Sequence, residues 1–137
     1  MRFVLVVIVA SLISLPLEAS EGAAVIPAQF RGEWHATLSR CGNSEDESFL
    51  YIGPHSVTYF ESAGPAKAAV VRKRELALIL ELSGEGETWL HTEQFELSRD
   101  SKTLTSKAFP GESYVRHRCP SERSNNSFKP KPLRGSA

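Results

Sequence analysis

Two glutamate–histidine pairs are the residues of this sequence best placed to do chemistry. Glu33 lies two residues from His35, and His91 lies two residues from Glu93. Side chains two apart on a strand point to the same face, so each carboxylate would orient its imidazole for acid–base work. Two pairs brought together would also offer metal ligands. Polar positions on solvated strand faces give the same pattern. We favour that simpler interpretation, with no metal site and no cofactor.

No other motif predicts catalysis. No serine lies in the Gly-x-Ser-x-Gly turn of a hydrolase. Gly84-Glu85-Gly86 is acidic and lacks the helix that follows a phosphate-binding loop, so it is typical of a hairpin turn. We therefore expect no catalytic residue. In the alternative of a hydrolase, His91–Glu93 or Glu33–His35 would be the acid–base pair.

The two cysteines, Cys41 and Cys119, predict a disulfide. An even cysteine count is typical of exported proteins with bridges, and the short Cys-x-x-Cys or Cys-x-x-His spacing of metal sites is absent. Closing a loop of about 80 residues would stabilise the fold by roughly 4 kcal/mol in the chain-entropy model.

The first residues of the chain predict export. Met1–Ala19 contains a basic Arg2, an apolar run from Phe3 to Leu15, and a small residue at Ala19 for cleavage. Residues 22–24 offer a second cleavage site. The apolar run is shorter than the ~18 to 20 residues of a permanent transmembrane helix. We expect a periplasmic or secreted protein with no stable membrane span after signal cleavage.

From Phe30 to Cys119, runs of alternating polar and apolar residues separated by turn residues predict short strands. The run from Leu76 to Leu82 also suits a helix. We predict a strand because leucine occupies every second position and the turn residues Ser83-Gly84-Glu85-Gly86 end the run. Strands are expected near 34–38, 48–52, 56–61, 68–73, 76–82, 89–97, 104–109 and 114–119.

About eight short strands predict an all-β fold, a small antiparallel meander. A disulfide requires Cα atoms within ~7 Å, so the bridge between Cys41 and Cys119 would make the first and last strands neighbours. This favours a closed barrel of the lipocalin or inhibitor type over a sandwich. Such a barrel is filled with side chains and leaves a shallow pocket at one mouth. Trp34 and Trp89 are our candidates for lining that mouth.

Flanking segments complete the expected organisation: a signal peptide over 1–19, a flexible N-terminal arm over 20–29, the disulfide-closed β domain over 30–119, and a disordered basic tail over 120–137. The formal net charge is +0, which gives no steer toward nucleic acid. Arg116-His117-Arg118 and the basic tail could bind phosphate or an anionic glycolipid, although a solvated chain end explains them as well.

Several motifs resemble those of a group of short exported bacterial proteins that has no established function. They are Ile26-Pro27-Ala28-x-Phe30-x-Gly32-x-Trp34 before Cys41, Tyr59-Phe60-Glu61-x-x-Gly64, Gly84-Glu85-Gly86-Glu87-x-Trp89, and Arg116-x-Arg118-Cys119-Pro120. The resemblance implies a common fold over most of the chain and identifies no catalytic residue.

Gly32-x-Trp34 followed by Cys41 is also similar to the first strand of the periplasmic inhibitors of secreted metalloproteases, which are eight-stranded barrels with one disulfide. In that family a flexible N-terminal segment enters the protease cleft, and the resemblance implies that residues 20–29 would be its counterpart.

These observations lead to three functional hypotheses. We favour an exported, non-catalytic protein-binding module, such as an inhibitor of a lytic enzyme or an immunity-type factor. Its partner would be another protein, and the acidic loop Glu45-Asp46-Glu47 would steer a basic one. The first alternative is a carrier of a small apolar ligand in a barrel mouth lined by Trp34 and Trp89. The second is the hydrolase described above.

Overall fold

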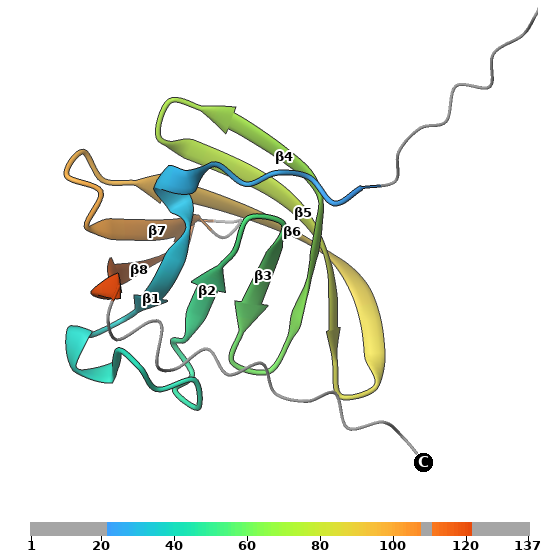
Figure 1. Ribbon diagram of the computed structural model, residues 1–137, viewed down its shortest axis with the longest axis horizontal. Coiled ribbons are helices and arrows are strands. Elements are labelled where there is room, and N and C mark those ends of the chain that lie inside the picture. The colour runs from blue at the N-terminus through green and yellow to red at the C-terminus, as the bar shows by residue number, and fades with distance from the viewer. Residues whose placement is uncertain (1–21, 108–110, 122–137) are drawn as a thin grey trace, which may run out of the picture.

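The computed structural model describes residues 22–107 and 111–121, and these form a closed antiparallel barrel (Figure 1). Each of the eight strands pairs with the next one along the chain, and the last pairs with the first. The predicted all-β meander and its closure into a barrel are therefore confirmed. The expected signal peptide and nearly all of the predicted tail lie outside the described residues. In the described part of the chain, no helix has the length and apolar character needed to cross a membrane.

Two short 3₁₀ helices accompany the eight strands. In chain order the elements are η1 (Ala28–Phe30), β1 (Gly32–His35), η2 (Leu38–Arg40), β2 (Leu50–Ile52), β3 (Ser56–Tyr59), β4 (Ala63–Arg72), β5 (Glu75–Gly84), β6 (Glu87–Leu97), β7 (Thr103–Lys107) and β8 (Ser113–Arg118). The leucine run is a strand, as its alternation predicts, and its four leucines face the barrel core at 0–3% exposure.

The largest differences from the predicted strand boundaries are at the start of β4 and the end of β1. β4 begins at Ala63, well before the start predicted near residue 68, and Gly64 lies against β5. A Cβ at Gly64 would overlap the carbonyl oxygen of Glu81, so glycine is required for this close backbone approach rather than for a turn. β1 ends at His35 instead of Leu38, and the next amide, that of Ala36, donates to Ser48 Oγ at 3.0 Å.

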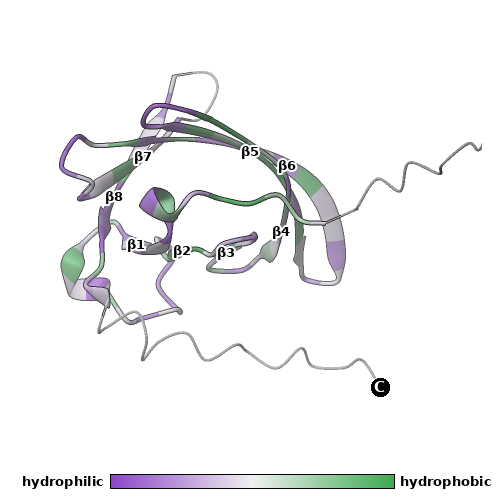
Figure 2. Cartoon of the chain, turned by 45° about the horizontal axis from the view of Figure 1, so that its top comes forward, coloured by the Kyte–Doolittle hydropathy of each residue, from purple (hydrophilic) through white to green (hydrophobic). Residues whose placement is uncertain are grey.

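The N-terminal segment closes one end of the barrel (Figure 2). Ile26 and Phe30 are fully buried in the core. The amide of Ala24 donates to the carbonyl of Ala66 at 2.7 Å, and that of Ile26 to Pro54 at 2.8 Å. The sequence predicts a flexible arm over 20–29; in the described part of that range, Ala24 and Ile26 are hydrogen-bonded to the barrel and Ile26 is buried in its core.

The disulfide joins Cys41 to Cys119 with a Cα–Cα distance of 5.6 Å, as predicted. Cys41 lies in the connection after η2, and Cys119 follows β8 directly. β1 and β8 pair through Trp34 opposite Arg118 and His35 opposite His117. The bridge therefore ties the β1–β2 connection to the end of the barrel's last strand.

Candidate functional site

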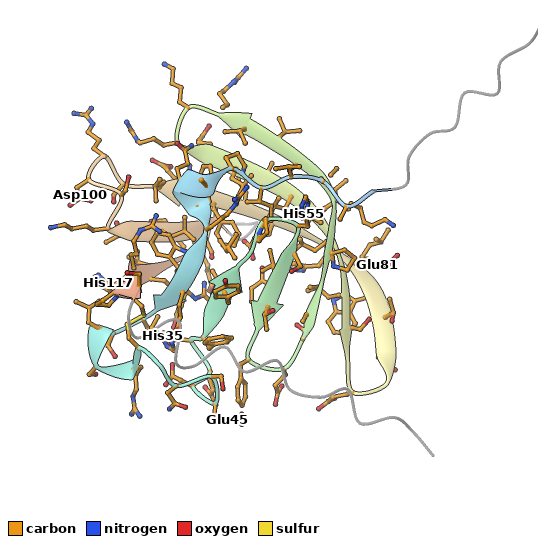
Figure 3. The ribbon with its side chains drawn as sticks, in the orientation of Figure 1. His35, Glu45, His55, Glu81, Asp100 and His117 are labelled. Carbon is orange, nitrogen blue, oxygen red and sulfur yellow. A yellow bond between two sulfur atoms is a disulfide. The ribbon has the colours of Figure 1, made fainter. Side chains whose placement is uncertain are left out.

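The Glu33–His35 pair exists but is enclosed. His35 Nε2 lies 2.8 Å from Glu33 Oε1, and the two side chains are 0% and 1% exposed. The prediction of a solvated strand face is wrong here, because the β1–β2 connection covers the outer face of β1. Figure 3 shows His35 inside this region, while Glu45 lies at its outer edge. The imidazole has no access to a substrate.

Further bonds make this pair part of a structural network. Glu33 Oε1 also accepts a bond from the amide of Gly42 at 2.7 Å. On its other side, His35 Nδ1 lies 3.5 Å from both Asp46 Oδ1 and Ser48 Oγ. Ser48 Oγ donates to the Asp46 carboxylate, and this bond is the main cause that lowers the pKa of Asp46, with His35 contributing. The network fixes the β1–β2 connection onto β1.

Glu33, His35 and Cys119 also place three donor atoms within 4.8 Å of one another. The sulfur of Cys119 is bonded to Cys41, and the carboxylate and imidazole bond each other. Since a cysteine binds a metal as its thiolate, Cys119 cannot serve as the third ligand of this group while the bridge is intact.

The second predicted pair lies on the inner row of β6. His91 Nε2 is 3.5 Å from Glu93 Oε2, and the side chains are 41% and 13% exposed. Across the barrel, the Tyr59 hydroxyl on β3 donates to Glu93 Oε2 at 2.9 Å. Its ring meets the His91 ring edge-on at 6.1 Å. Burial raises the pKa of Tyr59, and the charge of Glu93 adds to the rise, so the phenol keeps its proton. These contacts make Glu93 an acceptor held in place inside the barrel.

Arg116 brings a buried positive charge to the same region. Its Nε donates to the carbonyl of Ser48 at 2.8 Å and its Nη1 to Ser106 Oγ at 3.1 Å. The guanidinium carbon lies 4.6 Å from the centre of the Tyr114 ring. Burial lowers the pKa of Arg116, against the opposing effects of Tyr114, Tyr59 and Glu93. Within the described ranges, no carboxylate oxygen lies within 4.0 Å of its nitrogens.

A cavity of about 770 Å³ brings these side chains together. It lies beside Lys107, the last residue of β7. Its lining includes the polar or charged residues His91, Glu93, Ser106, Tyr114 and Arg116, and the aliphatic residues Ala68, Val70, Ala77, Leu78 and Ile79. Its volume lies within the roughly 300–1,000 Å³ of typical small-molecule sites. Of the aliphatic residues, Leu78 shares the inward face with Glu93, whereas Val70 and Ile79 are exposed on the outer face of the sheet. The inward part of the cavity can therefore hold a small ligand that bonds to polar groups.

The predicted binding residues occupy other places. Trp34 is fully buried and Trp89 is 40% exposed, and neither is among the residues that line this cavity. In the acidic loop, Glu45 and Glu47 are exposed, whereas Asp46 is committed to Ser48 and His35. Only two of the three carboxylates in that loop are free to steer a partner.

Sequence reasoning missed Ser106, and it grouped Arg116 with the basic tail as a possible anion-binding run instead of placing it inside the barrel. One signal was present: on β8, Tyr114, Arg116 and Arg118 alternate with Val115 and His117. The pairing of Arg116 with Leu104 places that first row inside the barrel. An arginine in the inward row of a small barrel is costly unless it has a partner, so an inward arginine is a candidate for a binding or a structural role.

Comparison with protein-family models, curated proteins and solved structures finds no match to this chain. The fold and the site alone define the class: an eight-stranded antiparallel up-and-down barrel, disulfide-closed, with a partly polar cavity.

Proposed function

We propose that this protein is an exported, non-catalytic binding protein that holds a small ligand in the cavity between β4 and β8. The observation that carries the proposal is the cavity itself, in which Leu78 on β5 lines the same inward space as His91, Glu93 and Arg116. Small-molecule sites combine a mostly apolar lining with a few fixed polar groups in this way. The signal-like residues Met1–Ala19 and the disulfide support a place outside the cytoplasm.

A neutral fluorescent probe, N-phenyl-1-naphthylamine, tests the proposal. We expect its fluorescence to rise on binding to the wild-type protein, with one site per chain. Leu78→Trp fills the cavity and should weaken binding by at least about tenfold, a loss of about 1.4 kcal/mol. Leu90→Trp is the matched control, because Leu90 is 68% exposed and does not line the cavity. Circular dichroism checks that both variants fold. Equal binding by both variants would refute the cavity as the site.

Protein binding remains a second candidate because apolar side chains form a row on the outer face of β4–β6. Val70 is 67% exposed, Ile79 40% and Leu90 68%. The register places them together: Val70 pairs with Ala77, and Ile79 pairs with Thr92. Contiguous exposed apolar surface is typical of interaction sites.

Capture experiments with the mature protein and envelope extract test this second function. A genuine partner should bind the wild-type protein and the control variant Leu38→Glu. Leu38 is also exposed, but it lies on η2 and not on the apolar row of β4–β6. It should be lost with Val70→Glu and Leu90→Glu. A partner retained by both of these variants would exclude the apolar row as its docking site.

A further inference from the structure

We infer that the inward part of this cavity binds a small zwitterion, whose carboxylate bonds to Arg116 and whose ammonium group bonds to Glu93. This inference rests on the proposed function and adds the chemical class of the ligand.

Strand register places both charged side chains on the inner surface of the barrel. Glu93 on β6 pairs with Leu78, and Arg116 on β8 pairs with Leu104. Both leucines belong to the core, at 2% and 1% exposure. Residues directly opposite each other in an antiparallel pair share a face, so Glu93 and Arg116 point inward as well. They line the same cavity from two different strands.

Arg116 has no anionic partner. Its side chain is only 9% exposed, and no carboxylate of the described residues lies within 4.0 Å of its nitrogens. Bonds to the Ser48 carbonyl and the Ser106 hydroxyl use two of the five N–H donors of the guanidinium, one on Nε and one on Nη1. A buried charge without a counter-charge is unfavourable. A ligand carboxylate would supply that charge and two acceptor oxygens for the remaining donors.

Glu93 has no permanently charged cationic partner. Its side chain is 13% exposed and accepts bonds from the Tyr59 hydroxyl at 2.9 Å and from the Gln94 amide at 3.2 Å. The nearest basic group is the His91 imidazole at 3.5 Å, and no lysine or arginine of the described ranges lies within 4.0 Å. A carboxylate can accept about four hydrogen bonds, so Glu93 can accept one from a ligand. An ammonium group would supply both a donor and the missing positive charge.

The two charges together exclude a ligand that carries only one. Glu93 is close enough to act on the pKa of Arg116, yet the two side chains form no ion pair within 4.0 Å. An anion at Arg116 is repelled by Glu93, and a cation at Glu93 is repelled by Arg116. Lys107, which also lines the cavity, is already paired with Glu75 and Glu96. A zwitterion satisfies both unpaired charges at once.

NMR titrations of the isotope-labelled, disulfide-intact protein at about pH 8, where an ordinary imidazole is neutral, test the inference. Glycine and 4-aminobutanoate carry both charges, at short and at long separation, whereas butanoate and butylamine carry one charge each. We expect one of the two zwitterions to bind about tenfold more tightly than either singly charged probe. The signals that shift should belong to residues around Glu93 and Arg116.

Glu93→Gln separates charge from structure, because the amide still offers an acceptor to the Tyr59 hydroxyl. This variant should bind the zwitterion about tenfold more weakly and butanoate more tightly than wild type, since the repulsion is lost. A purely structural role of Glu93 would not strengthen butanoate binding. Glu87→Gln is the matched control, because Glu87 is exposed at the start of β6 and does not line the cavity.

Arg116→Gln should have the opposite effect, with weaker binding of the zwitterion and tighter binding of butylamine. If this variant does not fold, Glu93→Gln decides alone. Butanoate that binds wild type as tightly as both zwitterions would overturn the role of Glu93, and butylamine that does so would overturn the role of Arg116. If neither zwitterion binds but the neutral fluorescent probe does, the inference fails and the proposed function stands. Failure of every probe would overturn both.

Discussion

The guanidinium of Arg118 lies over the ring of Trp34, with its central carbon 4.1 Å from the ring centre. The same guanidinium donates to three carbonyl groups, those of Gln29 at 2.6 Å, Arg31 at 2.7 Å and Ser101 at 2.8 Å. One side chain on the last strand therefore connects the first strand, the segment that leads into it and the turn between β6 and β7.

Replacement of Arg118 should be strongly destabilising. Arg118→Ala removes three charge-assisted hydrogen bonds and the stacking on Trp34, and we expect a loss of about 2–4 kcal/mol. Arg118→Lys should recover less than half, because an ammonium cannot match the planar fork. Urea denaturation measures both, with Arg72→Ala as an exposed control. A change below about 0.5 kcal/mol for Arg118→Ala, the range of ordinary surface substitutions, would contradict this role.

Gly64→Ala should disturb the crossing of β4 and β5. The added methyl group would overlap the backbone carbonyl of Glu81, which cannot rotate away as a side chain would. We expect a loss of about 1–3 kcal/mol, the usual range for overpacking. Gly53→Ala is the matched control, because its methyl group would meet no atom closer than 3.4 Å. Comparable losses at the two positions in thermal unfolding would show that the close approach does not matter.

Removal of the disulfide should weaken the fold without changing its topology. We expect the double variant Cys41→Ser/Cys119→Ser to lose about 2–5 kcal/mol, because the unfolded chain is no longer constrained across 78 positions. Denaturant titration of the variant and of wild type with a reducing agent should give the same midpoint. Two free thiols in unreduced, denatured wild-type protein would disprove the bridge.

Asp46 should contribute to stability in a pH-dependent way. Its pKa in the folded protein is lowered by the bond from Ser48, so its contribution is present above the ordinary value of about 3.9 and is lost as pH falls through the folded value. Asp46→Asn should therefore be less stable than wild type near pH 6 and should lose less stability between about pH 5 and pH 2. Glu45→Gln, an exposed neighbour, should follow the wild-type profile. Unfolding midpoints across this range provide the test.

The barrel could be predicted from the sequence because its evidence is local. The alternation of leucine from Leu76 to Leu82 identifies an inward row, and the cysteine positions imply that the first and last strands meet. Alternation also predicts that opposite faces of β1 differ in exposure, yet Glu33 and Trp34 are both buried. The cause is the β1–β2 connection, which folds over the outer face of β1. Residues 36–49 contain no periodic pattern from which this burial could be predicted.

The candidate site depends on register, which the sequence does not encode locally. Glu93 meets Tyr59 across 34 positions, and Arg116 reaches the carbonyl of Ser48 across 68. These long-range contacts depend on the register of every strand pair between the two residues. The aromatic character of Trp34 suggests a place at the barrel mouth, but the structure encloses its ring beneath the guanidinium of Arg118.

The barrel cannot close until its C-terminal strand has been synthesised. Arg118 bonds to Gln29 across 89 positions, and the bridge spans 78. The segment with Ile26 and Phe30 is therefore synthesised well before β8. The barrel end that it covers is complete only after β8 has formed. Contacts of such long sequence separation slow folding, because chain entropy is lost before they form. The export that we propose would suit this order of events, because the barrel cannot close before its last strand is available.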